Sequence, residues 1–318
     1  MLALASPASL KGVLSPAEAA AALVRGLRQV DGVEARELPV ADGGEGTAAV
    51  LHAALGGEWR SASVSDPLGR SVDARWLVLD DGTAIIDAAA ALGLPLVPEE
   101  ERDPLRETSD GLGELILCAV SQGAGSLVVG IGGTATVDGG EGMRRILGDR
   151  LRDVTVCAAC DVRNPLLGER GAARAFGPQK GADADAVEEL ERRLAAMDEL
   201  APYRDARGAG AGGGLGAAFA SIGAELVEGA ELVLDRIGFD DAARRAALVI
   251  TGEGKVDETT FEGKGPGAVA ARCRRFGVRC ELFGGLVDSG IEAHALSGDP
   301  ERAAGDLAEL AERLARRP

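Results

Sequence analysis

Six acidic residues lie in glycine-rich segments of this 318-residue chain, and most of them follow a predicted strand. They are Asp42, Glu45, Asp138, Asp161, Glu253 and Asp257. A single carboxylate in a glycine turn often bonds only its own backbone, so each one alone is a weak indication of function. The chain has only two histidines, so acid–base chemistry has to depend on these carboxylates or on lysines.

Lysine is rare in this chain and always lies directly beside glycine. Of the 34 Lys and Arg residues only four are lysines, namely Lys11, Lys180, Lys255 and Lys264. These positions are interpreted as places that need a compact, flexible ammonium group, although chance adjacency is the alternative in a chain with 46 glycines. Carboxylates that hold Mg²⁺ or orient a hydroxyl, together with cations on phosphate oxygens, are the groups that phosphoryl transfer requires.

The sequence lacks the standard nucleotide-binding motifs. No GxxxxGK[ST] P-loop is present, and the protein-kinase set of motifs is missing. A GxGxxG string at Gly208, Gly210 and Gly213 follows no predicted strand, which disfavours a dinucleotide site. Cys157 and Cys160 form a CxxC pair within a predicted buried strand, with no second pair nearby, and are interpreted as core residues.

The composition excludes several classes of partner. A net charge of −17 and a pI near 4.7 argue against nucleic acid and anionic membranes, which a negative surface repels. No apolar run approaches the roughly 20 residues that span a bilayer, and the first residues lack a charged leader region. The five cysteines, an odd number in a long chain, do not indicate a framework of disulfide bonds. We therefore expect a cytoplasmic protein whose substrate is a small molecule. A homodimer is the expected assembly.

The N-terminal part predicts the strand–helix–strand order that positions the first acidic segment. A strand over residues 2–5 is followed by a helix that begins at Ser15, which forms a capping box with Glu18. A second strand near residues 35–39 leads through the glycine segment at Asp42 into another helix. Ligand contacts at the carboxyl ends of strands are typical of α/β proteins.

A different pattern begins after residue 57. Three β-rich runs separated by turn signals predict an antiparallel meander. They cover residues 59–64, 72–79 and 83–87. Because an α/β sheet rarely contains such a meander without an insertion, we expect a second domain here. A helix over 109–120 and a buried parallel strand over 126–131 follow.

The C-terminal half continues the α/β alternation. We expect a strand at 154–160, an amphipathic helix through 187–197, a buried strand at 248–251 that ends at Gly252-Glu253-Gly254, a helix over 265–276, a strand over 278–283 and a helix over 301–314. The fold class predicted from this order is α/β with two interleaved domains.

Several specific strings resemble, in order, the signature blocks of bacterial glycerate kinases over residues 7 to 286. The strings are Ser9-Leu10-Lys11-Gly12, Asp42-Gly43-Gly44-Glu45-Gly46-Thr47, Gly130 to Gly142, Asp161-Val162-Arg163-Asn164-Pro165-Leu166, Phe176-Gly177-Pro178-Gln179-Lys180-Gly181, and Gly252-Glu253-Gly254 with Asp257 and Lys264. The resemblance implies ATP- and Mg²⁺-dependent phosphorylation of D-glycerate to 2-phosphoglycerate, by a kinase that uses an alcohol group as acceptor.

The resemblance also implies a fold and a site. The fold is a discontinuous Rossmann-like parallel-sheet domain, expected at residues 1–60 and 240–318 with 105–150 as a further part, and an inserted α/β domain at 61–239. The catalytic residues implied are Lys11, Asp161, Asp257 and Lys264. The substrate- or nucleotide-binding residues are Asp42, Gly43, Gly44, Glu45, Gly132, Gly133, Asn164, Gln179, Lys180 and Glu253. The Mg²⁺ ligands are Asp138, Asp161 and Asp257.

The chain departs from the family pattern at several of these blocks. Ala8 replaces an aspartate, Val137 an asparagine and Thr259 a glutamine, and a segment before the Cys157 strand is missing. Two alternatives therefore stay open. One is a family member without turnover that binds a metabolite or nucleotide, and the other is a kinase for another small hydroxy acid or polyol.

Overall fold

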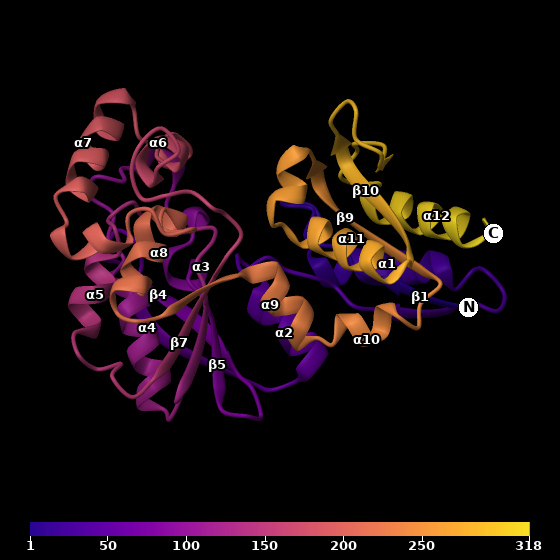
Figure 1. The fold of residues 1–318 in the computed structure, drawn as a ribbon, viewed down its shortest axis with the longest axis horizontal. Coiled ribbons are helices and arrows are strands. Elements are labelled where there is room, and N and C mark those ends of the chain that lie inside the picture. Colours follow the sequence, from indigo (N-terminus) through magenta and orange to yellow (C-terminus); the bar gives the residue numbers. More distant parts are fainter. Residues whose placement is uncertain (318) are drawn as a thin grey trace. The chain divides into compact units, whose positions relative to one another are not determined.

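A computed structural model describes residues 1–317 and divides the chain into two units (Figure 1). Unit 1 consists of Met1–Asp42 and the residues from Gly229 onward, and unit 2 is the segment Gly43–Glu228. Unit 1 is therefore discontinuous, with unit 2 inserted into it. None of the helices in the described part of the chain is both long and apolar enough to cross a membrane.

The observed boundaries differ from the expected ones at both ends of the insertion. Residues 43–60 and 105–150 belong to unit 2, and residues 229–239 belong to unit 1. The reason is packing: helix α2 (Thr47–Leu55) lies against two strands of unit 2, whereas helix α9 (Gly229–Arg236) lies against helix α11 (Gly265–Phe276) of unit 1.

Unit 1 contains a five-stranded, fully parallel sheet with the order β11-β10-β9-β1-β2. Its strands are β1 (Leu2–Ala5), β2 (Glu34–Glu37), β9 (Leu248–Val256), β10 (Arg279–Val287) and β11 (His294–Ala295). Its other helices are α1 (Pro16–Leu27), α10 (Phe239–Ala243), η5 (Glu258–Glu262) and α12 (Ala303–Ala315). The predicted Rossmann-like parallel sheet is confirmed.

Local signals account for the helices of unit 1. The capping box predicted at the start of α1 is present, because the Ser15 hydroxyl accepts from the Glu18 amide and the Glu18 carboxylate accepts from the Ser15 amide. The apolar faces of α1 and α12 pack on each other and on strands β1 and β9. Strand β1 pairs parallel with the first part of β9, with Ala5 beside Ile250, so both strands run toward the same edge of the sheet.

Unit 2 contains a six-stranded mixed sheet with the order β3-β4-β5-β6-β7-β8. Its strands are β3 (Glu58–Ser65), β4 (Ser71–Val78), β5 (Thr83–Asp87), β6 (Ser126–Gly130), β7 (Thr155–Cys160) and β8 (Glu225–Glu228). The first three strands pair antiparallel, as the meander predicted, and β5 to β8 pair parallel.

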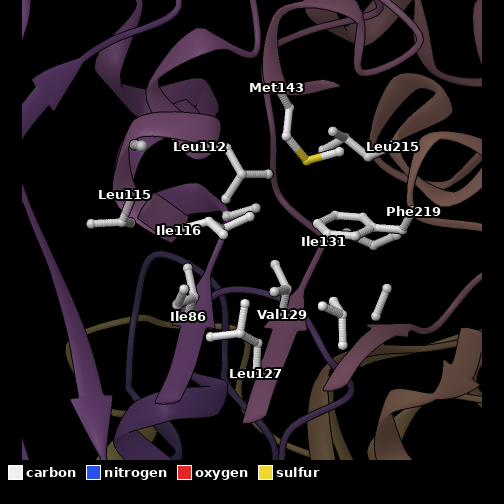
Figure 2. Close-up of a cluster of buried hydrophobic side chains, with 14 of the residues drawn as sticks. Ile86, Leu112, Leu115, Ile116, Leu127, Val129, Ile131, Met143, Leu215 and Phe219 are labelled. Atoms are coloured by element: carbon white, nitrogen blue, oxygen red, sulfur yellow. The ribbon is translucent and has the colours of Figure 1, made fainter. Parts of the chain in front are cut away.

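Helices cover this sheet and enclose the main core of unit 2. They are α2, α3 (Ala89–Leu92), α4 (Asp110–Ser121), α5 (Glu141–Leu147), α6 (Ala172–Phe176), α7 (Ala184–Ala195) and α8 (Ala211–Ser221), with the short helices η1 (Leu94–Leu96), η2 (Glu99–Glu101), η3 (Pro178–Lys180) and η4 (Asp198–Tyr203). Figure 2 shows Leu112 and Ile116 of α4 facing Val129 of β6 and Phe219 of α8, with Met143 of α5 at the edge.

One motif lies in a different element from the one predicted. Strand β9 continues to Val256, so Gly252-Glu253-Gly254 is part of the strand, not of a turn after it. The cause is the neighbouring strand, because Gly284 and Leu286 of β10 pair with Glu253 and Lys255. Strand pairing is a long-range interaction that glycine content alone does not reveal.

Candidate active site

The carboxyl ends of strands β1 and β9 carry one group of the predicted residues, all within unit 1. The chain after β1 stays beside β9, since the Ser6 amide donates to the Ile250 carbonyl at 2.8 Å and the Ala8 amide to the Gly252 carbonyl at 2.9 Å. The backbone of Lys11 then lies close to Gly254. The loop with Lys11 and the end of β9 therefore form one surface of unit 1.

Glu253, Asp257 and Lys264 form a charged cluster on this surface. The Lys264 ammonium lies 3.8 Å from Glu253 Oε2 and 3.9 Å from Asp257 Oδ1. Glu253 projects from β9, Asp257 is the first residue after it, and Lys264 is the N-cap residue of α11. A strand end and a helix start thus bring two carboxylates and one cation together.

The two carboxyl groups of this cluster have opposite pKa shifts. Hydrogen bonding by the Thr259 hydroxyl lowers the pKa of Asp257, and the ammonium groups of Lys255 and Lys264 lower it further. Burial raises the pKa of Glu253, although the Thr260 hydroxyl and Lys264 oppose this shift. Pairs of carboxyl groups whose environments separate their pKa values are typical of sites for acid–base or metal chemistry.

Two threonines that the sequence analysis did not assign to the site hold these carboxylates in place. The Thr260 hydroxyl donates to Glu253 Oε1 at 2.7 Å and accepts from the Asp257 amide at 3.1 Å. Thr259 donates to Asp257 through its amide at 3.0 Å and through its hydroxyl. The signal for Thr260 was the Asp-x-x-Thr spacing, which is typical of a capped helix start, and Thr259 directly precedes it.

The remaining charged groups of this surface surround the cluster. Lys255 lies 3.3 Å from both Asp257 and Asp288, with half of its side chain exposed. The negative charge of Asp42 contributes to the raised pKa of Glu253, so Asp42 also belongs to this neighbourhood. Unit 1 therefore brings together Lys11, Asp42, Glu253, Asp257 and Lys264 of the predicted residues.

Unit 2 brings together the two predicted glycine segments at the ends of its parallel strands. The Gly132 amide donates to the Gly43 carbonyl at 3.3 Å. A side chain on Gly130 would approach the Gly43 carbonyl oxygen to 2.7 Å, so only glycine permits this contact. Gly44 lies against Gly132, and Glu45 approaches Gly133. Backbone this close and free of side chains can approach a ligand such as a phosphate.

Asp87, at the carboxyl end of β5, is a further candidate for the site that the sequence analysis missed. Its carboxylate accepts from the Gly46 amide at 2.9 Å and the Ala48 amide at 3.1 Å, at the start of α2. Burial raises its pKa to about 6. Asp87 lines a pocket of about 210 Å³ together with Glu45, Trp59 and Arg75. Its position as an acidic residue ending a predicted strand was the available signal.

Asp138 acts as a cap for two helices of unit 2. Its Oδ2 atom accepts from the Ser109 amide at 2.8 Å, the Ser109 hydroxyl at 2.6 Å and the Gly142 amide at 3.2 Å, and Oδ1 accepts from the Gly140 amide at 3.0 Å. These donors lie at the starts of α4 and α5. The described contacts of Asp138 are thus with helix starts, and its predicted role as a Mg²⁺ ligand stays a prediction.

Asp138→Ala is expected to lower the melting temperature by about 5 °C, because a lost helix cap costs about 1–2 kcal/mol. Scanning calorimetry of the purified chain measures this change. Asp149→Ala is the matched control, since that carboxylate is highly exposed and bonds only Arg152 three residues away in the described structure. Equal melting temperatures for the two variants would contradict the capping role.

The other predicted residues of unit 2 are spread over separate contacts. Asp161 follows β7 and is half-buried. The Asn164 amide group donates to the Arg170 carbonyl at 2.7 Å, and Gln179 is exposed on η3. The Lys180 ammonium is buried and donates to the Thr136 carbonyl at 2.9 Å. These contacts give Asn164 and Lys180 structural partners within unit 2.

Two departures from the family pattern occupy buried positions. Val137 packs in an apolar cluster with Leu166 and Leu190, and the residue is 2% exposed. Ala8 is also buried beside β9. An apolar residue at 137 therefore suits its surroundings in unit 2.

The fold and these polar groups define a two-unit α/β protein with a carboxylate–lysine cluster in unit 1 and closely packed glycine loops in unit 2. The sequence model of the Glycerate kinase family matches residues 3–154 and 147–300. The chain belongs to the glycerate kinase family. The two matched ranges overlap at residues 147–154, where α5 connects to β7 and where the sequence analysis expected a segment of the family to be missing.

Two similar proteins and one similar crystal structure carry the name glycerate kinase. Glycerate 2-kinase of Escherichia coli K12 is 42% identical over 310 residues, which cover 85% of this chain and 81% of that protein. Glycerate kinase of Bacillus subtilis 168 is 41% identical over 86% of this chain and 82% of its own length. A crystal structure assigned as glycerate kinase 2 from Salmonella typhimurium LT2 superimposes with a TM-score of 0.83 at 35% identity, covering 99% of this chain and 97% of that one.

Proposed function

We propose that this chain transfers the terminal phosphoryl group of ATP to a hydroxyl of D-glycerate, giving 2-phosphoglycerate, with Mg²⁺ as cofactor. The observation that carries the proposal is the Glu253, Asp257 and Lys264 cluster within a chain that matches the family model from residue 3 to residue 300. The name of the Escherichia coli relative, a glycerate 2-kinase, supports the position of transfer. The homodimer and the cytoplasmic location stay predictions.

Glu253 and Asp257 suit the Mg²⁺ ion of such a reaction. Mg²⁺ in phosphoryl-transfer enzymes is held by one or two carboxylates, while waters and phosphate oxygens complete its coordination. Among residues 1–317 no group of three or more His, Cys, Asp or Glu side chains is arranged to hold a metal. Glu253 and Asp257 in unit 1 provide two carboxylates, and two are enough when phosphate oxygens and waters supply the other ligands of the ion. When bound, the ion would neutralise charge on the phosphate oxygens.

The residues of the chain supply the other requirements of the transfer. The lowered pKa of Asp257 keeps this carboxylate ionised near neutral pH. Lys264, held between two carboxylates, provides a compact cation for phosphate oxygens. Lys11, on the neighbouring exposed loop, is assigned to the carboxylate of glycerate or to a phosphate. We assign Asp161 to the attacking hydroxyl of glycerate, which this carboxylate would orient or deprotonate.

The test is a coupled assay of ATP consumption with D-glycerate and Mg²⁺, with the position of the phosphate read by ³¹P NMR. We expect turnover that requires all three components and a 2-phosphoglycerate signal. Asp161→Asn is expected to reduce kcat about 100-fold or more with an unchanged circular dichroism spectrum. Turnover like that of the wild type would remove Asp161 from the site.

The same assay separates the alternatives. A panel of small hydroxy acids and polyols, compared by kcat/KM, identifies a different acceptor if glycerate is not the best one. Calorimetric binding of ATP or glycerate without turnover of any panel member would overturn the kinase proposal in favour of a binding protein.

A further inference from the structure

Lys180 differs from the other three lysines because its ammonium group is enclosed by unit 2. The residue is 4% exposed, whereas Lys255 and Lys264 have side-chain exposures of 53% and 27%. Burial lowers the pKa of Lys180 to about 8. A buried ammonium is unfavourable unless it is hydrogen-bonded and balanced by opposite charge, so its immediate partners indicate its role.

The hydrogen-bond partner of Lys180 is the backbone of the loop 132–140, far away in the sequence. The ammonium donates to the Thr136 carbonyl at 2.9 Å. Gly213 also lies against this carbonyl, because an added Cβ would come within 2.0 Å of the Thr136 oxygen. Gly213 has a φ of 71°, and its own carbonyl accepts from the Gly139 amide at 3.1 Å. The middle of the loop is therefore enclosed by Lys180 and by the backbone at Gly213.

Further hydrogen bonds hold the first half of the same loop. The Ala135 amide donates to the Leu92 carbonyl at 2.8 Å, and the Leu94 amide donates to the Gly133 carbonyl at 3.1 Å. Through Gly132 the loop also contacts Gly43. The conformation of the loop therefore fixes the position of the backbone of Gly132 and Gly133.

Two acidic residues balance the charge of Lys180. The carboxylates of Glu107 and Asp138 both attract the ammonium and oppose the lowering of its pKa. Glu107 is 2% exposed, and burial raises its pKa to about 7. Its Oε1 atom accepts from the Asp103 amide at 3.2 Å, while its Oε2 atom has no hydrogen-bond partner among the described residues. Besides the Asp103 amide, the positive charges of Lys180 and, to a smaller extent, Arg102 stabilise the ionised form of this buried carboxyl group.

We propose that Lys180 is a positioning residue: its ammonium, balanced by Glu107 and Asp138, holds the Thr136 carbonyl and thereby the loop 132–140, and it does not contact phosphate or substrate. The role of this loop in turnover rests on the proposed function. The ordering of the loop by Lys180 does not, because it follows from the contacts within unit 2.

Hydrogen–deuterium exchange of the intact chain tests the ordering role. In Lys180→Met, peptides covering residues 132–140 are expected to exchange roughly fivefold faster, as the loss of one hydrogen bond of ordinary strength predicts. Arg150→Met is the matched control, because Arg150 also bonds a backbone carbonyl of unit 2, that of Leu147 at 3.1 Å, outside the loop. Equal exchange of the loop in both variants would overturn the proposal.

Steady-state kinetics distinguish positioning from direct contact. A misplaced loop is expected to lower kcat at least about tenfold while the KM values for ATP and glycerate change less than about threefold. A Lys180→Met variant that raises either KM with kcat unchanged would instead make Lys180 a substrate contact. If the wild type shows no kinase activity, the proposed function fails, and the exchange experiment still decides the role of Lys180.

The double variant Glu107→Gln/Lys180→Met covers the case in which Lys180→Met does not fold. Removing the lysine alone leaves a buried carboxylate without its countercharge, and the glutamine removes that carboxylate. We expect the double variant to melt at a higher temperature than Lys180→Met and to retain the fast exchange of residues 132–140. Slow, wild-type exchange of this loop in the double variant would contradict the proposal.

Discussion

Asp257→Asn is expected to lower kcat/KM for glycerate roughly 10³-fold while the fold is retained. The change removes an ionised carboxylate that lies 3.9 Å from Lys264 and that the neighbouring hydroxyl and ammonium groups keep ionised. Asparagine still has a side-chain oxygen that can accept from the Thr259 amide, so the start of η5 keeps its cap. Steady-state kinetics at saturating Mg²⁺, with circular dichroism as the measure of folding, check this result.

The matched control for this variant is Asp288→Asn. Asp288 lies 3.3 Å from the same Lys255 ammonium as Asp257, but its side chain is 52% exposed. An exposed ion pair contributes little, so kcat/KM is expected to stay within about threefold of the wild type. If both variants lose activity to the same extent, the lost charge near Lys255 explains the effect and Asp257 has no special role.

Lys264→Met is the second change with a large expected effect, a loss of kcat of about 100-fold. Lys264 is the cation that lies between Glu253 and Asp257, and methionine keeps the length of its apolar chain without the charge. Lys264 also stabilises the ionised forms of both carboxyl groups. Its removal therefore raises their pKa values, and the acid limb of the pH–rate profile is expected to move to higher pH.

Lys255→Met serves as the control for Lys264→Met. Its ammonium also lowers the pKa of Asp257, but it is more exposed and has Asp288 as a second partner. Kinetics from about pH 3 to about pH 9, a range that brackets ordinary carboxyl and histidine pKa values, compare the two variants. A wild-type kcat in Lys264→Met, with an unshifted acid limb, would contradict the assignment of Lys264 to the phosphates.

The family and the local elements could be predicted from the sequence because their signals are local. The capping box at Ser15, the apolar run of β6 and the helix Gly265–Phe276 depend on residues close in the chain, and each is present as predicted. The fold class followed from the alternation of such elements. The domain boundaries did not, because they depend on which sheet α2 and α9 pack against.

The residues of the candidate site were likewise only partly predictable from the sequence. Acidic residues and lysines beside glycines indicated phosphoryl-transfer chemistry, and their positions in the family's blocks indicated the acceptor. Only the tertiary structure distinguishes Asp257, in a cluster with Lys264, from Asp138, whose oxygens bond the starts of two helices. It likewise separates the other three lysines from the buried Lys180, whose partner Thr136 lies 44 residues away.

The sequence by itself therefore determined which chemistry this protein can support, since residue types and short-range spacing specify chemical groups and local structure. The tertiary structure decided which of those groups are available for it. Burial, charge balance and hydrogen bonding depend on strand order and on contacts between distant segments, as for Glu107 and Lys180. Two residues with the same local pattern can consequently have different roles, one in the chemistry and one in the shape of a loop.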